Sequence, residues 1–324
     1  MPDEPKPLTL YTAPLTGEQA VKLRKVLQRE NWEFSEKPYT LFFAQKLKLT
    51  AAVYEKGPKL VLQGKGAGDF VQFTLEPEVL GEARLGYEEV HNPEMYAPHF
   101  GIDESGKGDF FGPLVIAGVY VNRDIARIFQ KAGITDSKRI GSDKKIRDLA
   151  DLVKSTQGAV HNIVEIGPLK YNEMIARNGN LNKVLAWGHA RVIENLLARR
   201  PDCPRALSDQ FANPRMIQNA LMAEGKKITL EQRTKAESDL AVAAASILAR
   251  ERFIDAMEKS GKRFGVKLPR GASAEVKRIA RELAAAHTAE ILREVAKTHF
   301  KTASEVDPAA FPPKPETAVR SWKR

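Results

Sequence analysis

HFGIDESGKGDFFGPLVIAG, from His99 to Gly118, is the stretch around which the chain is organised. The adjacent carboxylates Asp103 and Glu104 precede a loop that reads Gly106-Lys107-Gly108, and an uncharged apolar run extends from Phe110 to Val121. Glycine and proline interrupt this pattern, which predicts a strand, a tight turn and a second strand. Carboxylates hold hard cations through oxygen, and a glycine backbone approaches a sugar–phosphate closely. The stretch therefore suits a metal-dependent site that cleaves phosphodiesters.

Two other interpretations compete with this one. Adjacent acidic residues at a strand end are explained equally well as solvated side chains. Gly101, Gly106 and Lys107 also fit all but the last position of the nucleotide-binding pattern G-x-x-x-x-G-K-[ST]. That pattern fails at Gly108, where a hydroxyl should hold magnesium, and the two carboxylates would repel a bound phosphate. A strand-like run follows instead of a helix, so we reject a P-loop.

Composition limits the class of protein. The 324-residue chain is 43% hydrophobic and 28% charged, as in an ordinary globular protein, and it is long enough for two domains. Its formal net charge of +10 indicates a polyanionic partner, and the lack of a basic amphipathic segment favours nucleic acid over a membrane. The single cysteine, Cys203, excludes an internal disulfide. With no signal-peptide pattern or long apolar run, we expect a cytoplasmic protein.

The N-terminal part has the pattern of a small α+β unit. Thr16 and Gln19 form a capping box at the start of a helix. From Tyr39 to Leu75 the apolar period changes to two, with lysines interleaved and a Gly57-Pro58 turn. This pattern predicts an antiparallel sheet with lysines projecting from one face, which either keeps a sheet edge soluble or contacts nucleic acid.

Strands and helices alternate beyond Val121, which predicts an α/β arrangement. Ser142 is expected to cap a helix that ends near Gly158, and a long helix is expected over 181–199. Asp209 ends a short apolar strand, and Asn213-Pro214 fits the start of a following helix. Further helices are expected from Thr234 onward and over 273–296.

The motifs together resemble type 3 ribonuclease H (ribonuclease HIII). Beyond the segment at Asp103, the resemblance runs in the family's order over essentially the whole chain. It rests on TDSK (135–138), NLNKVLAWGHARVIENLL (180–197), LSDQF (207–211), TKAES (234–238), AVAAASILAR (241–250) and THFK (298–301). The implied fold is a ribonuclease H-like catalytic domain, a mixed sheet flanked by helices, over 99–310. A domain resembling half of the TATA-binding-protein fold would precede it over 1–88, with a linker to about 98, and 311–324 would form an irregular tail.

The family's four carboxylates would be Asp103, Glu104, Asp209 and Glu237. Asp209 alone could equally be a loop aspartate that accepts backbone hydrogen bonds. Glu237 has a stronger alternative, because Thr234-x-x-Glu237 is itself a capping box. The resemblance decides for Glu237, and we rank Asp239, which would lie on a different helix face, well below it.

The implied chemistry is hydrolysis of RNA in RNA–DNA hybrids by two divalent ions, Mg²⁺ or Mn²⁺, leaving 5′-phosphate and 3′-hydroxyl ends. No small-molecule cofactor or membrane is implied, and a monomer is expected. His189 and His299 would serve packing or hydrogen bonding. The expected substrate contacts are Ser105, Gly106, Lys107, Gly108 and Lys138, and in the N-terminal domain Lys46, Lys48, Lys59, Gln63 and Lys65.

Two rival functions stay open. A non-catalytic nucleic-acid binder fits the basic charge but leaves the spaced carboxylates unexplained. The sister type 2 ribonuclease H shares the carboxylates but carries arginine where Lys107 stands, and lacks the N-terminal domain. Type 2 enzymes also read an RNA–DNA junction with a tyrosine in a Gly-Tyr-Gly stretch. The comparable stretch here, Leu268 to Ser273, has no tyrosine.

Overall fold

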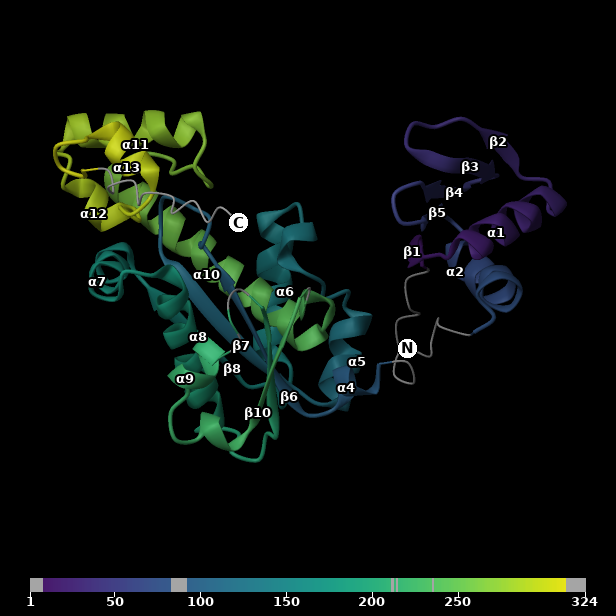
Figure 1. Ribbon diagram of the computed structural model, residues 1–324, viewed down its shortest axis with the longest axis horizontal. Coiled ribbons are helices and arrows are strands. Elements are labelled where there is room, and N and C mark those ends of the chain that lie inside the picture. The colour runs from purple at the N-terminus through teal and green to yellow at the C-terminus, as the bar shows by residue number, and fades with distance from the viewer. Residues whose placement is uncertain (1–7, 83–91, 211–212, 214, 235, 313–324) are drawn as a thin grey trace, which may run out of the picture. The chain divides into compact units, whose positions relative to one another are not determined.

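The computed structural model describes residues 8–82, 92–210, 213, 215–234 and 236–312. The chain divides into two compact units, Met1–Pro93 and Glu94–Arg324, which are coloured from purple to yellow along the chain in Figure 1. Part of the predicted linker, 89–91, and most of the predicted tail, 313–324, lie outside the described residues. Phe311, at the start of that tail, is buried in the core of the second unit.

The N-terminal unit is a five-stranded antiparallel sheet in the order β1-β5-β4-β3-β2. Its elements are β1 (Leu10–Pro14), α1 (Gly17–Arg29), β2 (Glu33–Ser35), β3 (Thr40–Lys46), β4 (Leu49–Tyr54), β5 (Lys59–Gly64), α2 (Ala67–Phe70) and a π-helical stretch (Val71–Leu80). The capping box is confirmed, since the Gln19 N–H donates to Thr16 Oγ1 at 3.1 Å and the Thr16 N–H to Gln19 Oε1 at 2.9 Å.

One face of this sheet is covered by helices. Alternate residues of β3 and β5, such as Phe42 and Leu60, pack in one core with Leu23 of α1 and Leu75 of the π-helical stretch. The period of two expected as far as Leu75 is wrong beyond Gly66. The apolar residues there recur every three to four positions, a spacing that buries one side of a helix.

The second unit contains a five-stranded mixed sheet in the order β10-β9-β6-β7-β8. Strand β6 pairs antiparallel with β7 and parallel with β9, and β10 is parallel to β9. The strands are β6 (His99–Ser105), β7 (Leu114–Val121), β8 (His161–Ile166), β9 (Arg205–Asp209) and β10 (Thr229–Arg233). The helices are α4 (Pro93–Tyr96), α5 (Arg123–Lys131), α6 (Asp143–Ser155), α7 (Pro168–Asn178), α8 (Leu181–Leu197), α9 (Arg215–Ala220), α10 (Leu240–Phe264), α11 (Ala274–Ala286), α12 (Ile291–Val295) and α13 (Lys301–Val306), with 3₁₀ turns at Ser137–Arg139, Gly225–Lys227 and Ala236–Ser238.

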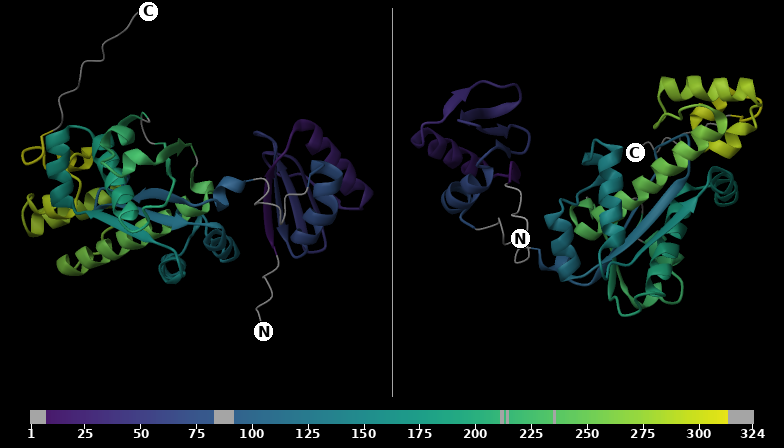
Figure 2. Two further views of the ribbon diagram at one scale, coloured as in Figure 1. Left: turned by 90° about the horizontal axis from the view of Figure 1, so that it is seen from below. Right: turned by 180° about the vertical axis from the view of Figure 1, so that it is seen from behind.

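Helices α10 and α8 cover opposite faces of this sheet. A Cβ on Gly101 of β6 would lie 2.2 Å from the backbone of Ala241, so only glycine allows α10 to approach so closely. A Cβ on Gly118 of β7 would instead meet Val192 of α8 at 2.6 Å. The views in Figure 2 show α10 running along β6 and β7. Central strands buried on both faces explain the uncharged run after residue 110.

Helix positions were predicted unevenly. The helix that Ser142 caps and the long helix over 181–199 are confirmed as α6 and α8, each ending two or three residues early. The single helix expected over 273–296 is wrong. It is two helices, α11 and α12, which pack against different partners, α13 and α7. Splitting the helix lets both halves bury their apolar residues, a tertiary effect that periodicity alone does not reveal.

Candidate active site

Strand β6 presents the two adjacent carboxylates to opposite faces of the sheet, because successive side chains on a strand alternate. Asp103 shares the α10 face with Gly101. Glu104 lies on the α8 face, where its Oε2 is 3.1 Å from His189 Nε2. The acidic pair therefore ends the central strand with one carboxylate directed toward each layer of helices.

The surroundings of the Asp103 carboxyl group favour a bound cation. Its side chain is buried, and Oδ1 accepts a hydrogen bond from the Glu104 N–H at 2.8 Å. Burial, and next the negative charge of Glu104, raise the pKa of Asp103 well above its usual range. A divalent cation at this point would offset both effects, so the donor set fits a hard metal ion.

Glu104 is held in its charged form. Burial alone would raise its pKa, but the hydrogen bond and charge of His189, together with Lys107, outweigh burial and lower the pKa to about 2. The Lys107 ammonium lies 3.3 Å from Glu104 Oε1. Glu104 is therefore an anion near neutral pH, with its orientation fixed from two sides.

Asp209 lies at the end of β9, next to β6. The two strands are parallel, with Ile102 in register with Ser208, so Asp103 and Asp209 are the next residues along neighbouring strands. Asp209 Oδ1 accepts a long hydrogen bond of 3.5 Å from the Ala236 N–H, in the 3₁₀ turn that contains Glu237. Asp209 thus connects the end of β6 with the segment that carries the fourth predicted carboxylate.

The helix start predicted at Thr234 is wrong, because Glu237 lies in a turn before the helix. Helix α10 begins at Leu240, and Asp239 is its N-cap, accepting from the N–H groups of Ala241 at 2.8 Å and Val242 at 3.3 Å. Asp239 also lies 3.0 Å from His99 Nε2. The rival Asp239 therefore has a structural role, and capping no longer explains Glu237.

Lys138 lies among the predicted ligands. Its partial burial would lower the pKa, but the charges of Asp103, Asp136, Glu237 and Glu104 outweigh this and raise it. Within the described residues, no three acidic, histidine or cysteine side chains already converge on one point. The acids are neighbours that would need to turn toward a metal ion.

Asp136 was not predicted as a site residue. It is buried, its charge contributes to the raised pKa of Asp103, and its Oδ1 accepts from the Lys138 N–H at 3.1 Å. The signal was present in the sequence, because aspartate two residues before Lys138 is typical of a turn in which the side chain bonds the backbone. The prediction that His189 makes a hydrogen bond is confirmed, but the sequence did not identify Glu104 as its partner.

The glycine loop has two distinct glycines. Gly106 has a positive φ of 86°, and a Cβ there would lie 2.2 Å from the Pro113 carbonyl oxygen, so no other residue fits. Around Gly108 there is nothing within 4 Å of a Cβ position, which leaves the backbone accessible to a ligand. Ser105 ends β6 beside this loop, half-buried.

The N-terminal candidates do not form one basic face. Lys59 and Gln63 lie together on the face of β5 that the helices leave uncovered. Lys46 is in register with the buried Leu49, and its ammonium donates to the Glu30 carbonyl at 2.8 Å, on the helix-covered side. Lys48 lies in the β3–β4 turn and Lys65 beyond β5. The lysines that alternate in the sequence are separated by the β3–β4 turn, and the sequence pattern alone does not reveal that turn.

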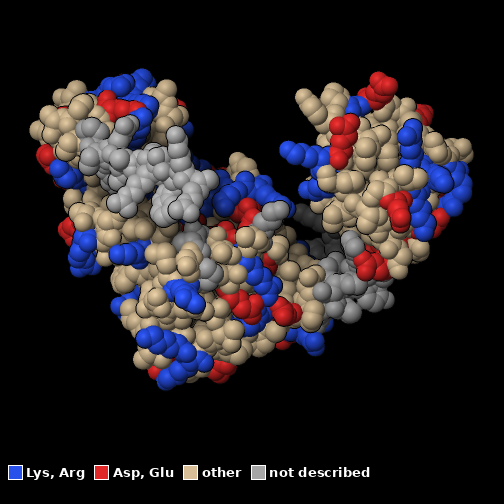
Figure 3. Space-filling model, in the orientation of Figure 1, with Lys and Arg blue, Asp and Glu red and all other residues tan. Residues whose placement is uncertain are grey.

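Charge is mixed over the surface. Figure 3 shows Lys and Arg interspersed with Asp and Glu on the visible face of each unit. Many of the basic groups are ion-paired, as Arg147 is with Asp255 and Glu258 at 2.9 Å. No helix within the described ranges combines the length and apolarity that crossing a membrane requires.

Comparisons with known proteins agree with this architecture. The family model for ribonuclease HII matches residues 100–303. Ribonuclease HIII of Protochlamydia amoebophila is 44% identical, over 87% of this chain and 92% of the relative. Ribonuclease HIII of Chlamydia caviae is 41% identical, over 88% and 93% respectively.

Solved structures extend the similarity to the fold. The crystal structure of Bst-RNase HIII in complex with Mn²⁺ has a TM-score of 0.63 and 26% identity, covering 92% of this chain and 98% of that one. Aquifex aeolicus RNase H3 has a TM-score of 0.51 and 26% identity, covering 89% and 98%.

The mixed sheet flanked by helices and the match to these enzymes define a class, the metal-dependent endoribonucleases with the ribonuclease H fold. The similarity extends well beyond residues 100–303, into the N-terminal unit, and the relatives that share it carry one name. The chain belongs to the ribonuclease HIII family.

Proposed function

We propose that the chain hydrolyses the RNA strand of RNA–DNA hybrid duplexes at a site formed by Asp103, Glu104, Asp209 and Glu237. The observation that supports this most strongly is the gathering of these acids where β6, β9 and the turn before α10 end. Two Mg²⁺ or Mn²⁺ ions are the proposed cofactors. Manganese has a precedent in the similar structure in complex with Mn²⁺.

The four carboxylates are the proposed ligands of the two ions. Asp103, on the central strand, would hold the ions together with Glu104, Asp209 and Glu237. Bound there, two cations would supply activation of the attacking water and stabilisation of the departing 3′-oxygen, and the proposed products carry 5′-phosphate and 3′-hydroxyl ends. His189 and Lys107 keep Glu104 ionised and oriented before a metal arrives.

Other residues supply substrate recognition in this proposal. The accessible backbone at Gly108 reaches 2′-hydroxyl groups, which distinguish RNA from DNA. The charges of the nearby acids raise the pKa of Lys138, so its ammonium remains charged. In this proposal it contacts a phosphate next to the cut. The N-terminal unit adds affinity through Lys48, Lys59, Gln63 and Lys65, whereas the contact of Lys46 with Glu30 makes it the weakest candidate.

A cleavage assay on a uniform RNA–DNA hybrid tests the proposal. The intact protein is expected to cut only the RNA strand, only with Mg²⁺ or Mn²⁺, and to leave ends that a 5′-phosphate-dependent exonuclease accepts. Matched DNA–DNA and RNA–RNA duplexes serve as controls. Cleavage in excess chelator, or equal cleavage of all three duplexes, would contradict the proposed reaction.

A further inference from the structure

Lys297 is a buried lysine that the proposed reaction does not use. It follows α12, and its side chain is 0% exposed. Its ammonium donates to three backbone carbonyl oxygens, those of Asp109 at 2.9 Å, Phe111 at 3.3 Å and Gly112 at 2.7 Å. Burial lowers its pKa to about 7, although the charge of Asp109 acts in the opposite direction. An ammonium has three protons, so its donors match these three acceptors.

A purely space-filling role does not account for this residue. Burying an ammonium is costly, and an apolar side chain of the same length would fill the volume without that cost. The charge of Asp109 and the Tyr171 ring, whose centre is 5.7 Å from the ammonium, favour the charged form, but the hydrogen bonds of the ammonium within the described residues all go to backbone carbonyls. What the ammonium provides instead is a fixed position for the backbone of 109–112.

That backbone segment forms the base of the glycine loop. It directly follows Gly108, and the Asp109 N–H donates to the Gly106 carbonyl at 3.3 Å. The Lys297 N–H donates to the Phe110 carbonyl, and the Gly112 N–H to the Val295 carbonyl, both at 2.8 Å. The main chain and the side chain around Lys297 therefore both hold residues 109–112 in place.

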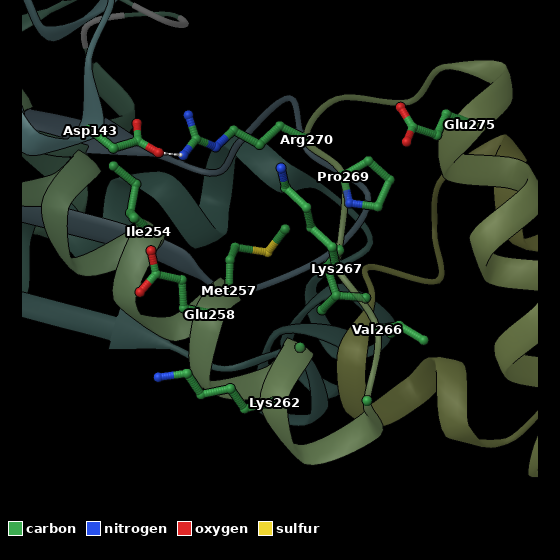
Figure 4. Close-up of a pocket in the computed structure, with 13 residues that line it drawn as sticks. Asp143, Ile254, Met257, Glu258, Lys262, Val266, Lys267, Pro269, Arg270 and Glu275 are labelled. Carbon is green, nitrogen blue, oxygen red and sulfur yellow. Dashed lines mark hydrogen bonds and ion pairs between the residues drawn. The ribbon is translucent and has the colours of Figure 1, made fainter.

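The same segment also holds the stretch from Leu268 to Gly271. The Asp109 carboxylate accepts from the Gly271 N–H at 2.6 Å, and the Phe110 N–H donates to the Gly271 carbonyl at 2.9 Å. Arg270 is ion-paired with Asp143 at 2.6 Å across a pocket of about 800 Å³ (Figure 4). The glycine loop and this stretch are thus joined through residues that Lys297 immobilises.

We propose that Lys297 is a positioning residue for substrate recognition, whose ammonium fixes residues 109–112 and thereby the Gly106–Gly108 loop. The inference rests on the proposed function, in which that loop contacts the RNA strand. Lys297 itself touches neither the substrate nor the carboxylates. Its loss should therefore weaken recognition of the hybrid more than it slows the chemical step.

The test compares Lys297→Met with the wild-type full-length protein in steady-state cleavage of a uniform hybrid. We expect KM to rise roughly tenfold or more, with a smaller change in kcat, because the loop binds the substrate before and during the reaction. Lys154→Met is the matched control. Lys154 pairs with the buried Glu251 at 2.6 Å, in the same unit, in an ion pair that does not involve residues 106–112. It should lower the melting temperature while leaving KM unchanged.

Three results would overturn the inference. They are an unchanged KM in folded Lys297→Met, a drop confined to kcat, or an equal rise of KM in Lys154→Met, which would reveal general destabilisation. A wild-type protein that cuts no hybrid would instead refute the proposed function. If Lys297→Met does not fold, ¹⁵N spectra of the lysine ammonium groups of the wild-type protein at pH 6 test the positioning role instead. Hybrid binding should then shift the Lys297 signal, and a signal that stays unchanged on saturation contradicts the role.

Discussion

Two acids two residues apart should respond to mutation in opposite ways. Asp239 caps α10 and contacts His99, whereas Glu237 lies in the turn that precedes this helix. We expect Glu237→Gln to abolish most cleavage, by about a hundredfold or more, while the protein remains as stable as the wild type. Asp239→Ala should do the opposite, lowering the stability of the protein while most of its cleavage activity remains.

The size of the stability loss follows from the contacts of Asp239. Removing an N-cap costs about 0.5–2 kcal/mol. Leaving the buried His99 nitrogen without its partner costs about 1–3 kcal/mol more. The sum, roughly 1.5–5 kcal/mol, lowers the melting temperature of a unit of this size by about 3–20 °C.

Thermal unfolding and single-turnover cleavage, measured on the same protein samples, separate the two outcomes. Asp239→Asn is the control for Asp239→Ala, since its side-chain oxygen still caps the helix. If Glu237→Gln cut hybrids at the wild-type rate, Glu237 would be removed from the proposed site. If it melted as early as Asp239→Ala, the assignment of the cap to Asp239 would be refuted.

Four further outcomes are expected. Deleting residues 1–88 should weaken hybrid binding and flatten its salt dependence, because fewer lysines displace counterions; an unchanged slope in a salt titration would exclude the N-terminal unit as a binding surface. A single ribonucleotide embedded in DNA should be cut roughly a hundredfold more slowly than a run of ribonucleotides, since most 2′-hydroxyl contacts of Gly106–Gly108 are lost at about 1–3 kcal/mol each; equal rates on the two duplexes would favour a junction-sensing type 2 enzyme. Tyr171→Phe should raise stability by about 1 kcal/mol, as the buried Tyr171 hydroxyl has no hydrogen-bond partner within the described residues, and a lower melting temperature would reveal a bond to that hydroxyl. Glu104 has its pKa lowered from 4.5 to about 2, so its contribution to stability is complete above pH 4.5 and is lost as the pH falls toward 2; Glu104→Gln should remove that part of the acid dependence, seen in unfolding curves between these pH values.

The sequence predicted those structural features that depend on residues close to one another in the chain. The capping box at Thr16, the cap at Ser142 and the strands on either side of the Gly106–Gly108 loop all follow from residues within a few positions of one another. The carboxylates Asp103 and Glu104 could be chosen from sequence because an acidic pair beside a glycine loop is a local signal.

Features that depend on tertiary contacts were missed. Asp239, the N-cap of α10, is contacted by His99, which lies 140 residues earlier. Lys46, on the covered face of the sheet, donates to the carbonyl of Glu30, the C-cap of α1, sixteen positions earlier. The His189–Glu104 contact joins a helix and a strand 85 positions apart. No pattern in a single sequence encodes such distances.

The division of Asp103 and Glu104 between the two faces of the sheet has a consequence for the newly made protein. The α8 layer, which holds Glu104, is synthesised well before α10, against which the Asp103 face packs. A growing chain that has emerged only as far as β10 would hold Asp103, Glu104 and Asp209 but neither Glu237 nor the helix that keeps Asp103 away from water. The proposed site is therefore complete only after α10, which ends at Phe264, has left the ribosome.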